Sequence, residues 1–162
     1  MLIVLFAIIA FVVAADQVTK VVIYGHDMPV INGVIRFAST QNTGVAWGML
    51  NGVKGATVIL AIFTALVICA MIFVIVKYRK TMPWIVGVPF AAVVGGAIGN
   101  LIDRAFLGYV RDFIATEFID FPVFNVADCF VTCGGIALVI ALFFTKPGKA
   151  FMNVLFPEKK GK

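Results

Sequence analysis

Two long uncharged runs constrain this chain more than any other feature of its sequence. Gly55–Val76 and Thr81–Ile102 are each 22 residues long and contain no charged side chain. A helix needs about 20 mostly apolar residues to cross the hydrocarbon core of a bilayer. The composition agrees, because 62% of the 162 residues are hydrophobic and only 13% are charged, against roughly 45–50% and about 25% in a soluble globular domain. The sequence therefore predicts an integral membrane protein.

Two further apolar segments complete the predicted bundle. Cys129–Thr145 is apolar, and extending it back to Phe121 adds only one charge, that of Asp128. Met1–Ala15 could be the apolar region of a secretory signal peptide, but it lacks a preceding basic region and its apolar character resumes at Val21–Tyr24. A spanning helix is therefore favoured. We expect one integral membrane domain over residues 1–162, all-α, with four transmembrane helices at about residues 1–24, 55–76, 81–104 and 122–145.

The distribution of charge predicts how these spans are oriented. The loop between the second and third spans and the C-terminal tail together carry eight basic residues and one acidic residue. The opposite side carries five basic and seven acidic residues. Because basic loops stay in the cytoplasm, both termini are expected inside and the loops 25–54 and 103–122 outside. The basic excess then indicates topology and contact with anionic membrane lipids, and no nucleic-acid partner.

The first outer loop contains the sequence signature of a β-hairpin. Asn32-Gly33 lies between β-branched residues, a strong hairpin signal. A strand-like stretch, Arg36–Gln41, is followed by a second turn at Asn42-Thr43-Gly44. A small β-structure is therefore expected outside the membrane.

Acidic residues gather at one side of the predicted bundle, and this clustering is the main indication of function. All of them except Glu158 lie at the outer ends of the spans or in the outer loops, and an ionisable residue near a span is a functional-site hypothesis by default. Asp16 and Lys20 are four residues apart and can pair on one helix face. They form either a neutralised pair with Lys20 reaching toward water or a substrate-facing pair.

The third and fourth spans present further polar residues at their outer ends. Small residues in Gly95–Gly99 predict close helix packing, and Asn100 and Arg104 lie one turn apart, facing the same way. Asn125 followed by Asp128 is a plausible helix cap. Capping alone would explain that pair if other carboxylates did not lie at the same predicted depth.

Most catalytic chemistries are excluded by the residue inventory. A zinc-protease helix needs two histidines, and the chain has only His26. A serine or cysteine mechanism would have to recruit His26 without a supporting motif, and pairing of Ser39 with Lys54 has no recognisable signature. Cys129 and Cys133 are read as core residues, without a convincing set of metal ligands. The mechanism for which the chain has the most suitable residues is one in which two carboxyl groups share a proton.

Two other functions, neither of them peptide cleavage, are alternatives to this interpretation. An ion-coupled transporter would carry charges near the midplane of the bilayer and some internal symmetry, and the sequence has neither. A non-enzymatic assembly factor would use Gly95–Gly99 for packing but would leave the aspartates unexplained.

Three carboxylates, those of Asp103, Asp112 and Asp128, are candidates for the two members of a catalytic pair. Asp128 opens the fourth span, and its partner is Asp103 or Asp112. Asp103 directly precedes Arg104 and closes the third span, so either a salt bridge or a contact with the helix end is expected to engage it. A carboxylate bound to an arginine has a lowered pKa and is a poor proton donor. Asp112 is adjacent to Arg111, but neighbouring side chains of an extended segment point to opposite sides. The residues therefore favour Asp112.

Five stretches together resemble the signal peptidase II family of bacterial membrane aspartic proteases. They occur in the family's order over residues 16–128. They are Asp16–Lys20 (DQVTK), Gln41–Gly48 (QNTGVAWG), Gly95–Arg104 (GGAIGNLIDR), Gly108–Phe113 (GYVRDF) and Phe124–Asp128 (FNVAD). Two departures are Arg111, where the family often has an apolar residue, and Cys129 after the last aspartate.

The resemblance implies a four-helix bundle with a small extracytoplasmic β-cradle, in the bacterial plasma membrane and with the active site near the outer face. It implies cleavage of prolipoproteins just before a diacylglyceryl-modified cysteine, with no metal or organic cofactor. It also implies roles for ten residues. Asp112 and Asp128 would be catalytic; Asn42, Gly44, Asn100, Arg104 and Asn125 would bind substrate or support the aspartates; and Asp16, Lys20 and Asp103 would be structural.

Overall fold

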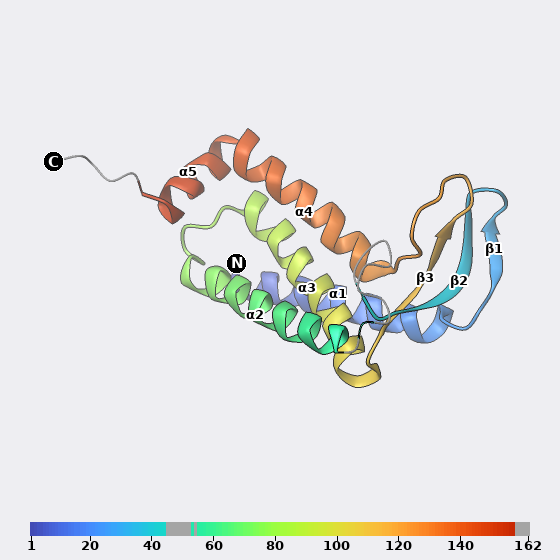
Figure 1. Cartoon of the computed structure of the whole chain (residues 1–162). Helices are drawn as coiled ribbons and strands as arrows, with labels where there is room; N and C mark the ends of the chain where they lie inside the picture. Colours follow the sequence, from blue (N-terminus) through green and yellow to red (C-terminus); the bar gives the residue numbers. More distant parts are fainter. Residues whose placement is uncertain (45–52, 54, 158–162) are drawn as a thin grey trace.

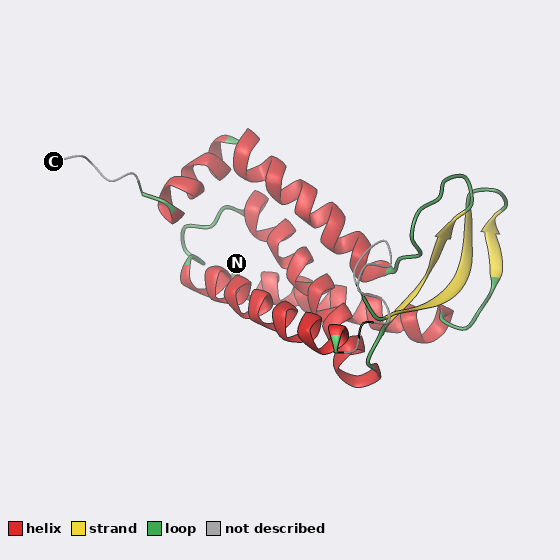
Figure 2. Ribbon diagram, in the orientation of Figure 1, coloured by secondary structure: helices red, strands yellow, loops and turns green. Residues whose placement is uncertain are grey.

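Four long helices form a bundle with a small sheet at one end (Figures 1 and 2). The computed structural model describes residues 1–44, 53 and 55–157. The elements in chain order are α1 (Leu2–Ile23), β1 (Met28–Ile31), β2 (Ile35–Asn42), α2 (Ala56–Lys77), α3 (Trp84–Leu107), β3 (Val110–Thr116), α4 (Val126–Phe144) and α5 (Lys146–Leu155). In Figure 1 the sheet lies at one end of the bundle, here named the sheet end, and α5 at the other, the α5 end.

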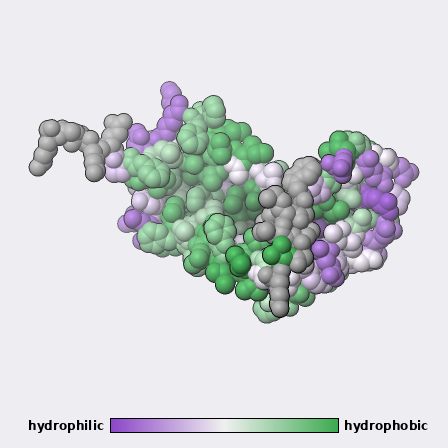
Figure 3. All heavy atoms as spheres, in the orientation of Figure 1, coloured by the Kyte–Doolittle hydropathy of each residue, from purple (hydrophilic) through white to green (hydrophobic). Residues whose placement is uncertain are grey.

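The four predicted spans are confirmed as helices long and apolar enough to cross a membrane. In α1, Leu5, Ile9 and Val12 are buried in the core of the bundle, as expected for a packed first span. Large apolar side chains on the other faces of the helices are exposed, such as Ile3 and Phe63, and Figure 3 shows a mainly hydrophobic surface over the bundle. Such a surface matches lipid, because a soluble protein rarely exposes large apolar patches.

Small residues on α3 bring the helix backbones together, as the sequence predicts. A Cβ atom on Gly95 would lie 2.7 Å from Cβ of Val12 in α1, and a Cβ atom on Gly96 would lie 2.5 Å from the carbonyl oxygen of Ala127 in α4. The glycines therefore set the distance between α3 and its two neighbours, which also carry the polar residues of the sheet end.

We expect Gly96→Ala to destabilise the folded protein by about 1–3 kcal/mol, because the added methyl group meets the backbone of α4, which cannot move aside cheaply. Gly135→Ala is the matched control, since no atom lies within 4 Å of a Cβ placed there. Thermal unfolding of the purified variants in the same detergent measures the difference. Equal transition temperatures for Gly96→Ala and the unsubstituted protein would contradict the packing argument.

The predicted hairpin is present and belongs to a three-stranded antiparallel sheet in the order β1-β2-β3. Gly33 occupies the turn with φ +72°, a left-handed conformation that suits glycine. The strand β3 lies in the segment 103–122 that the sequence predicts as a loop, and it pairs with β2 so that Thr40 is opposite Asp112. The strand was not recognised because its two charged residues, Arg111 and Asp112, interrupt the alternation of apolar and polar residues. Both side chains lie largely inside the protein instead of on a solvent-exposed face.

The helix α5 is an element that the sequence analysis did not predict, because the lysine-rich tail was considered only for its charges. Thr145 caps α5 by accepting a hydrogen bond from the Gly148 amide at 3.1 Å. Phe151 is 2% exposed and packs edge-on against Tyr78, with ring centroids 5.8 Å apart. One apolar face therefore folds α5 back onto the bundle, which the local lysine content does not reveal.

The ends of the spans also differ by a few residues from the predicted ones. The third span begins at Trp84, after Pro83, and continues to Leu107, where Gly108 ends the helix with φ +79°. The fourth begins at Val126 instead of residue 122, because Asn125 caps it. These boundaries leave Asp103 inside a helix and Asp112 on a strand.

Candidate active site

Asp128 is held at the start of α4 by the predicted cap. The Asn125 side-chain oxygen accepts a hydrogen bond from the Asp128 amide at 3.0 Å. In return, the Asn125 amide donates to Oδ2 of Asp128 at 3.1 Å. The other carboxylate oxygen, Oδ1, accepts from the Asn100 side-chain amide in α3 at 2.8 Å. The capping interpretation is confirmed, and the same contacts fix the orientation of the carboxylate.

Asp112 faces the bundle from β3 and is 1% exposed. Its Oδ2 accepts from the Asn42 side-chain amide at 3.0 Å, and its Oδ1 accepts from the Asn125 side-chain amide at 2.6 Å. Burial, and secondarily the negative charge of Asp128, raise the pKa of Asp112 to about 7. This carboxyl group is therefore about half protonated near neutral pH.

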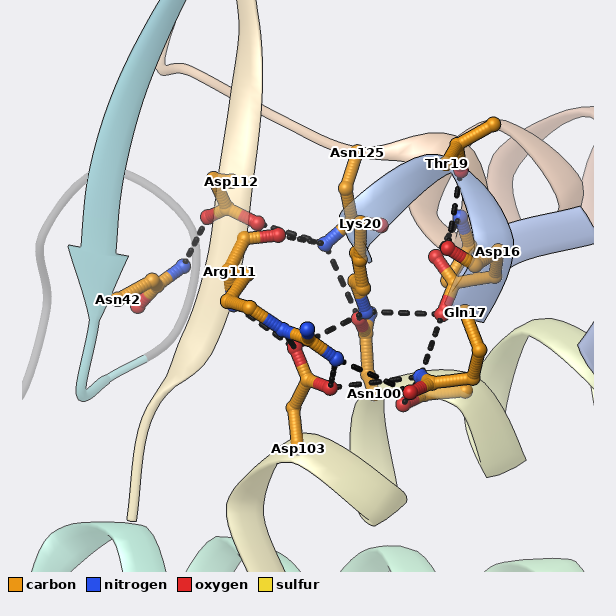
Figure 4. Close-up of polar contacts among 12 residues, drawn as sticks. Asp16, Gln17, Thr19, Lys20, Asn42, Asn100, Asp103, Arg111, Asp112 and Asn125 are labelled. Carbon is orange, nitrogen blue, oxygen red and sulfur yellow. Dashed lines mark hydrogen bonds and ion pairs between the residues drawn. The ribbon is translucent and has the colours of Figure 1, made fainter. Parts of the chain in front are cut away.

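Asn125 and Asn100 connect the carboxylates and the elements that carry them. The Asn125 side-chain amide also donates to Oδ1 of Asn100 at 3.1 Å. The same Asn100 oxygen accepts from Nζ of Lys20 in α1 at 2.9 Å. One chain of hydrogen bonds thus links α1, α3, α4 and β3, and Figure 4 shows most of it in close-up.

Asp103 is bound by two basic side chains, Arg111 and Lys20, and not by its neighbour Arg104. Both side chain and backbone of Arg111 bind it, with Nη2 at 2.8 Å from Oδ1 and the backbone amide at 2.9 Å from Oδ2. Lys20 lies 3.4 Å from Asp103 as well. Arg104 points elsewhere, because side chains adjacent on a helix face different directions. The alternation expected in the extended segment is confirmed, since Arg111 points to α3 and Asp112 to Asn125.

Lys20 forms the predicted ion pair with Asp16 at 2.9 Å. The expectation that its ammonium reaches toward water is wrong, because Lys20 and Asp16 are both 0% exposed. The sheet and the ends of α3 and α4 cover them. Asp16 is used twice more, since Oδ1 accepts from the Ala127 amide at 3.0 Å and Oδ2 from the Gln17 side chain at 3.1 Å. The pair therefore holds α1 to α4.

Arg104 and the predicted turn at residues 42–44 lie beside the two carboxylates. Asn42 accepts from the Gly44 amide at 3.0 Å, which closes the turn, and Nη2 of Arg104 donates to the Gly44 carbonyl oxygen at 3.1 Å. Within residues 1–44, 53 and 55–157, the buried Nε of Arg104 has no hydrogen-bond partner. The remaining residues of the Gln41–Gly48 motif, together with Lys54 and the tail from Glu158, lie outside the described residues.

The two residues considered for other catalytic chemistries are hydrogen-bonded to the backbone, and Lys54, the partner considered for Ser39, lies outside the described residues. His26 is bonded to the Ile23 carbonyl oxygen at 3.1 Å, and Ser39 to the Gly25 amide at 2.6 Å. Over the described ranges, no three His, Cys, Asp or Glu side chains gather closely enough to hold a metal ion.

Comparison with known proteins agrees with this arrangement. A family profile described as Signal peptidase (SPase) II matches residues 8–144. The lipoprotein signal peptidase of Enterococcus faecalis is 37% identical over 163 residues, which cover 94% of this chain and 98% of that protein. The chain belongs to the signal peptidase II family. The lipoprotein signal peptidase of Geobacillus thermodenitrificans is 41% identical over 142 residues, 83% of this chain and 86% of the relative.

The fold of this signal peptidase II member is similar to that of solved bacterial membrane enzymes. A bacterial membrane enzyme aligns with a TM-score of 0.72 and 31% identity over 98% of this chain and 93% of its own. Membership makes the chain a multi-pass membrane peptidase of the aspartic type. The transporter and assembly-factor alternatives are therefore set aside.

Two residues of the site went unrecognised in the sequence. Arg111 was noted only as the neighbour of Asp112 and as a departure from the family pattern, and Gln17 was not singled out. Gln17 accepts from Nη2 of Arg111 at 3.0 Å and donates to Oδ1 of Asp103 at 3.3 Å. The available signal was alternation in the strand, which shows that Arg111 points away from Asp112 but does not indicate its partner.

Proposed function

We propose that Asp112 and Asp128 are the catalytic pair with which this peptidase removes signal peptides from prolipoproteins. The observation that carries the proposal is that one residue holds both carboxylates. The Asn125 side chain donates to Asp112 at 2.6 Å while its backbone amide donates to Asp128 at 3.1 Å. The two aspartates are 16 residues apart in the sequence. In the structure they lie close together, because the side chain and the backbone amide of Asn125 each bind one of them.

The raised pKa of Asp112 supports a division of roles between the two carboxyl groups. An ionised carboxylate takes a proton from water, and a protonated one donates to the carbonyl oxygen of the scissile peptide bond. Asp112, with its pKa near 7, is the proton donor, and Asp128 is the base at the positive end of the α4 dipole. Water adds to the carbonyl carbon as Asp128 takes its proton and Asp112 protonates the carbonyl oxygen. The C–N bond then breaks, the leaving amine takes the proton from Asp128, and Asp112 regains a proton from a hydroxyl group of the intermediate.

The surrounding amides and Arg104 have separate tasks in this proposal. Asn42, Asn100 and Asn125 orient the carboxylates that they contact. Arg104 binds the substrate backbone, because its guanidinium is anchored on the Gly44 carbonyl and its buried Nε is a donor without a partner among the described residues.

The substrate we propose is a prolipoprotein whose cysteine carries a diacylglyceryl group. The carboxylates lie at the sheet end of an apolar bundle, where helices meet a polar sheet (Figure 3). A lipidated cysteine is anchored at that depth, since each buried CH₂ group contributes about 0.8 kcal/mol. The scissile bond just before it then lies beside the two carboxylates.

Cleavage in proteoliposomes tests this function directly. The purified enzyme is given one precursor in two forms, with and without the diacylglyceryl group. We expect cleavage immediately before the cysteine and at least a 100-fold preference in kcat/KM for the lipidated form. Equal cleavage of both forms would refute the lipid requirement, and cleavage of neither would refute the activity.

We propose further that the sheet end faces outward and that both termini are cytoplasmic. In the described part of the chain, Lys77, Arg79, Lys80, Lys146 and Lys149 lie at the α5 end and every acidic residue lies toward the sheet end. Basic ends remain inside.

Labelling of single cysteines in whole cells measures this orientation. With Cys69, Cys129 and Cys133 replaced, we expect an impermeant maleimide to label Asp120→Cys but not Arg79→Cys until the membrane is opened. Labelling of Arg79→Cys from outside in intact cells would contradict the proposed orientation.

A further inference from the structure

Arg111 is a largely buried arginine of β3, with a side chain 16% exposed, and it makes several polar contacts. Its guanidinium binds Asp103 through two nitrogens, with Nη2 at 2.8 Å from Oδ1 and Nε at 3.2 Å from Oδ2. The same Nη2 donates to the Gln17 side-chain oxygen at 3.0 Å. Figure 4 shows Arg111 reaching from β3 toward Asp103 and Gln17.

The backbone of Arg111 is held from both sides as well. Its amide donates to Oδ2 of Asp103 at 2.9 Å, and its carbonyl oxygen accepts from the Asn125 side chain at 3.3 Å. That Asn125 amide is the group that also binds Asp112. The peptide that precedes Asp112 is therefore fixed between α3 and the start of α4.

Arg111 also balances the charge beneath the two proposed catalytic carboxylates. Asp16 and Asp103 are 0% and 1% exposed, and Lys20 is 0% exposed. One lysine shared between two carboxylates, at 2.9 and 3.4 Å, leaves one negative charge over. Arg111 supplies the second cation, at 2.8 Å from Asp103. Without it, Lys20 would be drawn toward Asp103 and away from Asn100, which holds Asp128.

We infer that Arg111 is a positioning residue for peptide cleavage: by binding Asp103 in a two-nitrogen fork it fixes the strand that presents Asp112 and neutralises the buried cluster beneath the pair. The inference rests on the proposed roles of Asp112 and Asp128. It assigns no contact with substrate to Arg111. The fork geometry and the charge are separate contributions, because lysine can supply the charge but not the two-nitrogen contact.

Two substitutions separate these contributions. Arg111→Lys keeps the charge and loses the fork, whereas Arg111→Gln loses both. Arg36→Gln is the matched control, since Arg36 lies on the neighbouring strand β2 and pairs with the exposed Asp27. Each enzyme is purified in folded, monodisperse form, and kcat and KM for a lipidated precursor are measured from pH 5 to pH 9.

We expect Arg111→Lys to lower kcat about 10-fold at unchanged KM and to keep the pH profile. Arg111→Gln is expected to lower kcat about 100-fold, since a misplacement of about 1 Å costs that much. It should also move the alkaline limb upward by about one pH unit, because the uncompensated charge of Asp103 disfavours ionisation of Asp112. The charged groups around Asp112 that remain unchanged are Asp128, Lys20 and Arg104.

Four outcomes separate this inference from the proposed function. Folded Arg111→Gln enzyme with the kcat and pH profile of the parent would overturn the inference, and lower yield alone would mean a purely structural role and overturn it too. Active Asp112→Asn enzyme would instead overturn the catalytic assignment. Inactive Asp112→Asn together with an intermediate Arg111→Lys supports both.

Discussion

Asp112→Asn and Asp128→Asn should each lower the rate of precursor cleavage by about 10³-fold or more while the protein still folds and inserts. An asparagine keeps the size of the side chain but only one acceptor oxygen, so it retains one of the two hydrogen bonds that each carboxylate accepts. It can neither take nor deliver the proton that hydrolysis requires. Because the pair acts as a unit, the double variant should be no slower than the single ones. Single-turnover cleavage of a lipidated precursor at saturating enzyme measures the effect.

Asp120→Asn is the matched control for both substitutions, because Asp120 is an exposed carboxylate in the loop between β3 and α4. It should retain the parent rate. Monodisperse Asp112→Asn enzyme with near-normal turnover would move the catalytic role to Asp103, the remaining carboxylate of the three that the sequence offers. Loss of folding in both variants would be recognised by size-exclusion chromatography before any rate is compared.

Lys20→Met should cause the largest loss of stability among single substitutions at the site, about 3–5 kcal/mol. The methionine fills similar volume, but it leaves Asp16 and Asp103 with one cation between them and removes the 2.9 Å contact to Asn100. A buried charge without a partner is the costly element, much more than the loss of the ion pair itself. Thermal unfolding in detergent, followed by circular dichroism, gives the shift.

The comparison variant for this substitution is Lys149→Met, which removes an exposed lysine from α5. Exposed ion pairs and charges contribute between 0 and about 1 kcal/mol, so its transition should stay near that of the parent. Equal stability of Lys20→Met and Lys149→Met would show that the buried cluster is not held by charge balance. Partial recovery by combining Lys20→Met with Asp16→Asn would support charge balance directly.

The local parts of the fold could be predicted from the sequence because local rules govern them. Uncharged runs of membrane length identify spans, Asn32-Gly33 identifies a turn, and Asn125 with Asp128 identifies a helix start. Each signal lies within a few neighbouring residues and does not depend on the remainder of the chain. Strand β3 and helix α5 were missed because their charged residues obscured the pattern. In addition, β3 is stabilised by pairing with β2, which is distant in the sequence, and Phe151 of α5 packs against Tyr78 at the end of α2.

The arrangement of the site depends on contacts that no local rule describes. Asp103 was expected to pair with its neighbour Arg104, yet the way β3 crosses the end of α3 brings Arg111 to it instead. Lys20 lies near a predicted span end, which suggests access to water, but the sheet covers it. Both errors come from the same source, since the sequence predicts that a sheet exists without indicating which helix ends it closes.

The i, i+4 spacing of Asp16 and Lys20 also bears on the biogenesis of the protein. A membrane protein is made from its N-terminus, so the first span meets the bilayer before residues 103 and 111 have been synthesised. Two opposite charges within one helix turn can neutralise each other at 2.9 Å without any other part of the chain. The first span therefore carries its own counterion into the membrane, and the later arrival of Asp103 together with Arg111 adds one charge of each sign. The cluster is therefore neutral both as the Asp16–Lys20 pair alone and after Asp103 and Arg111 have joined it.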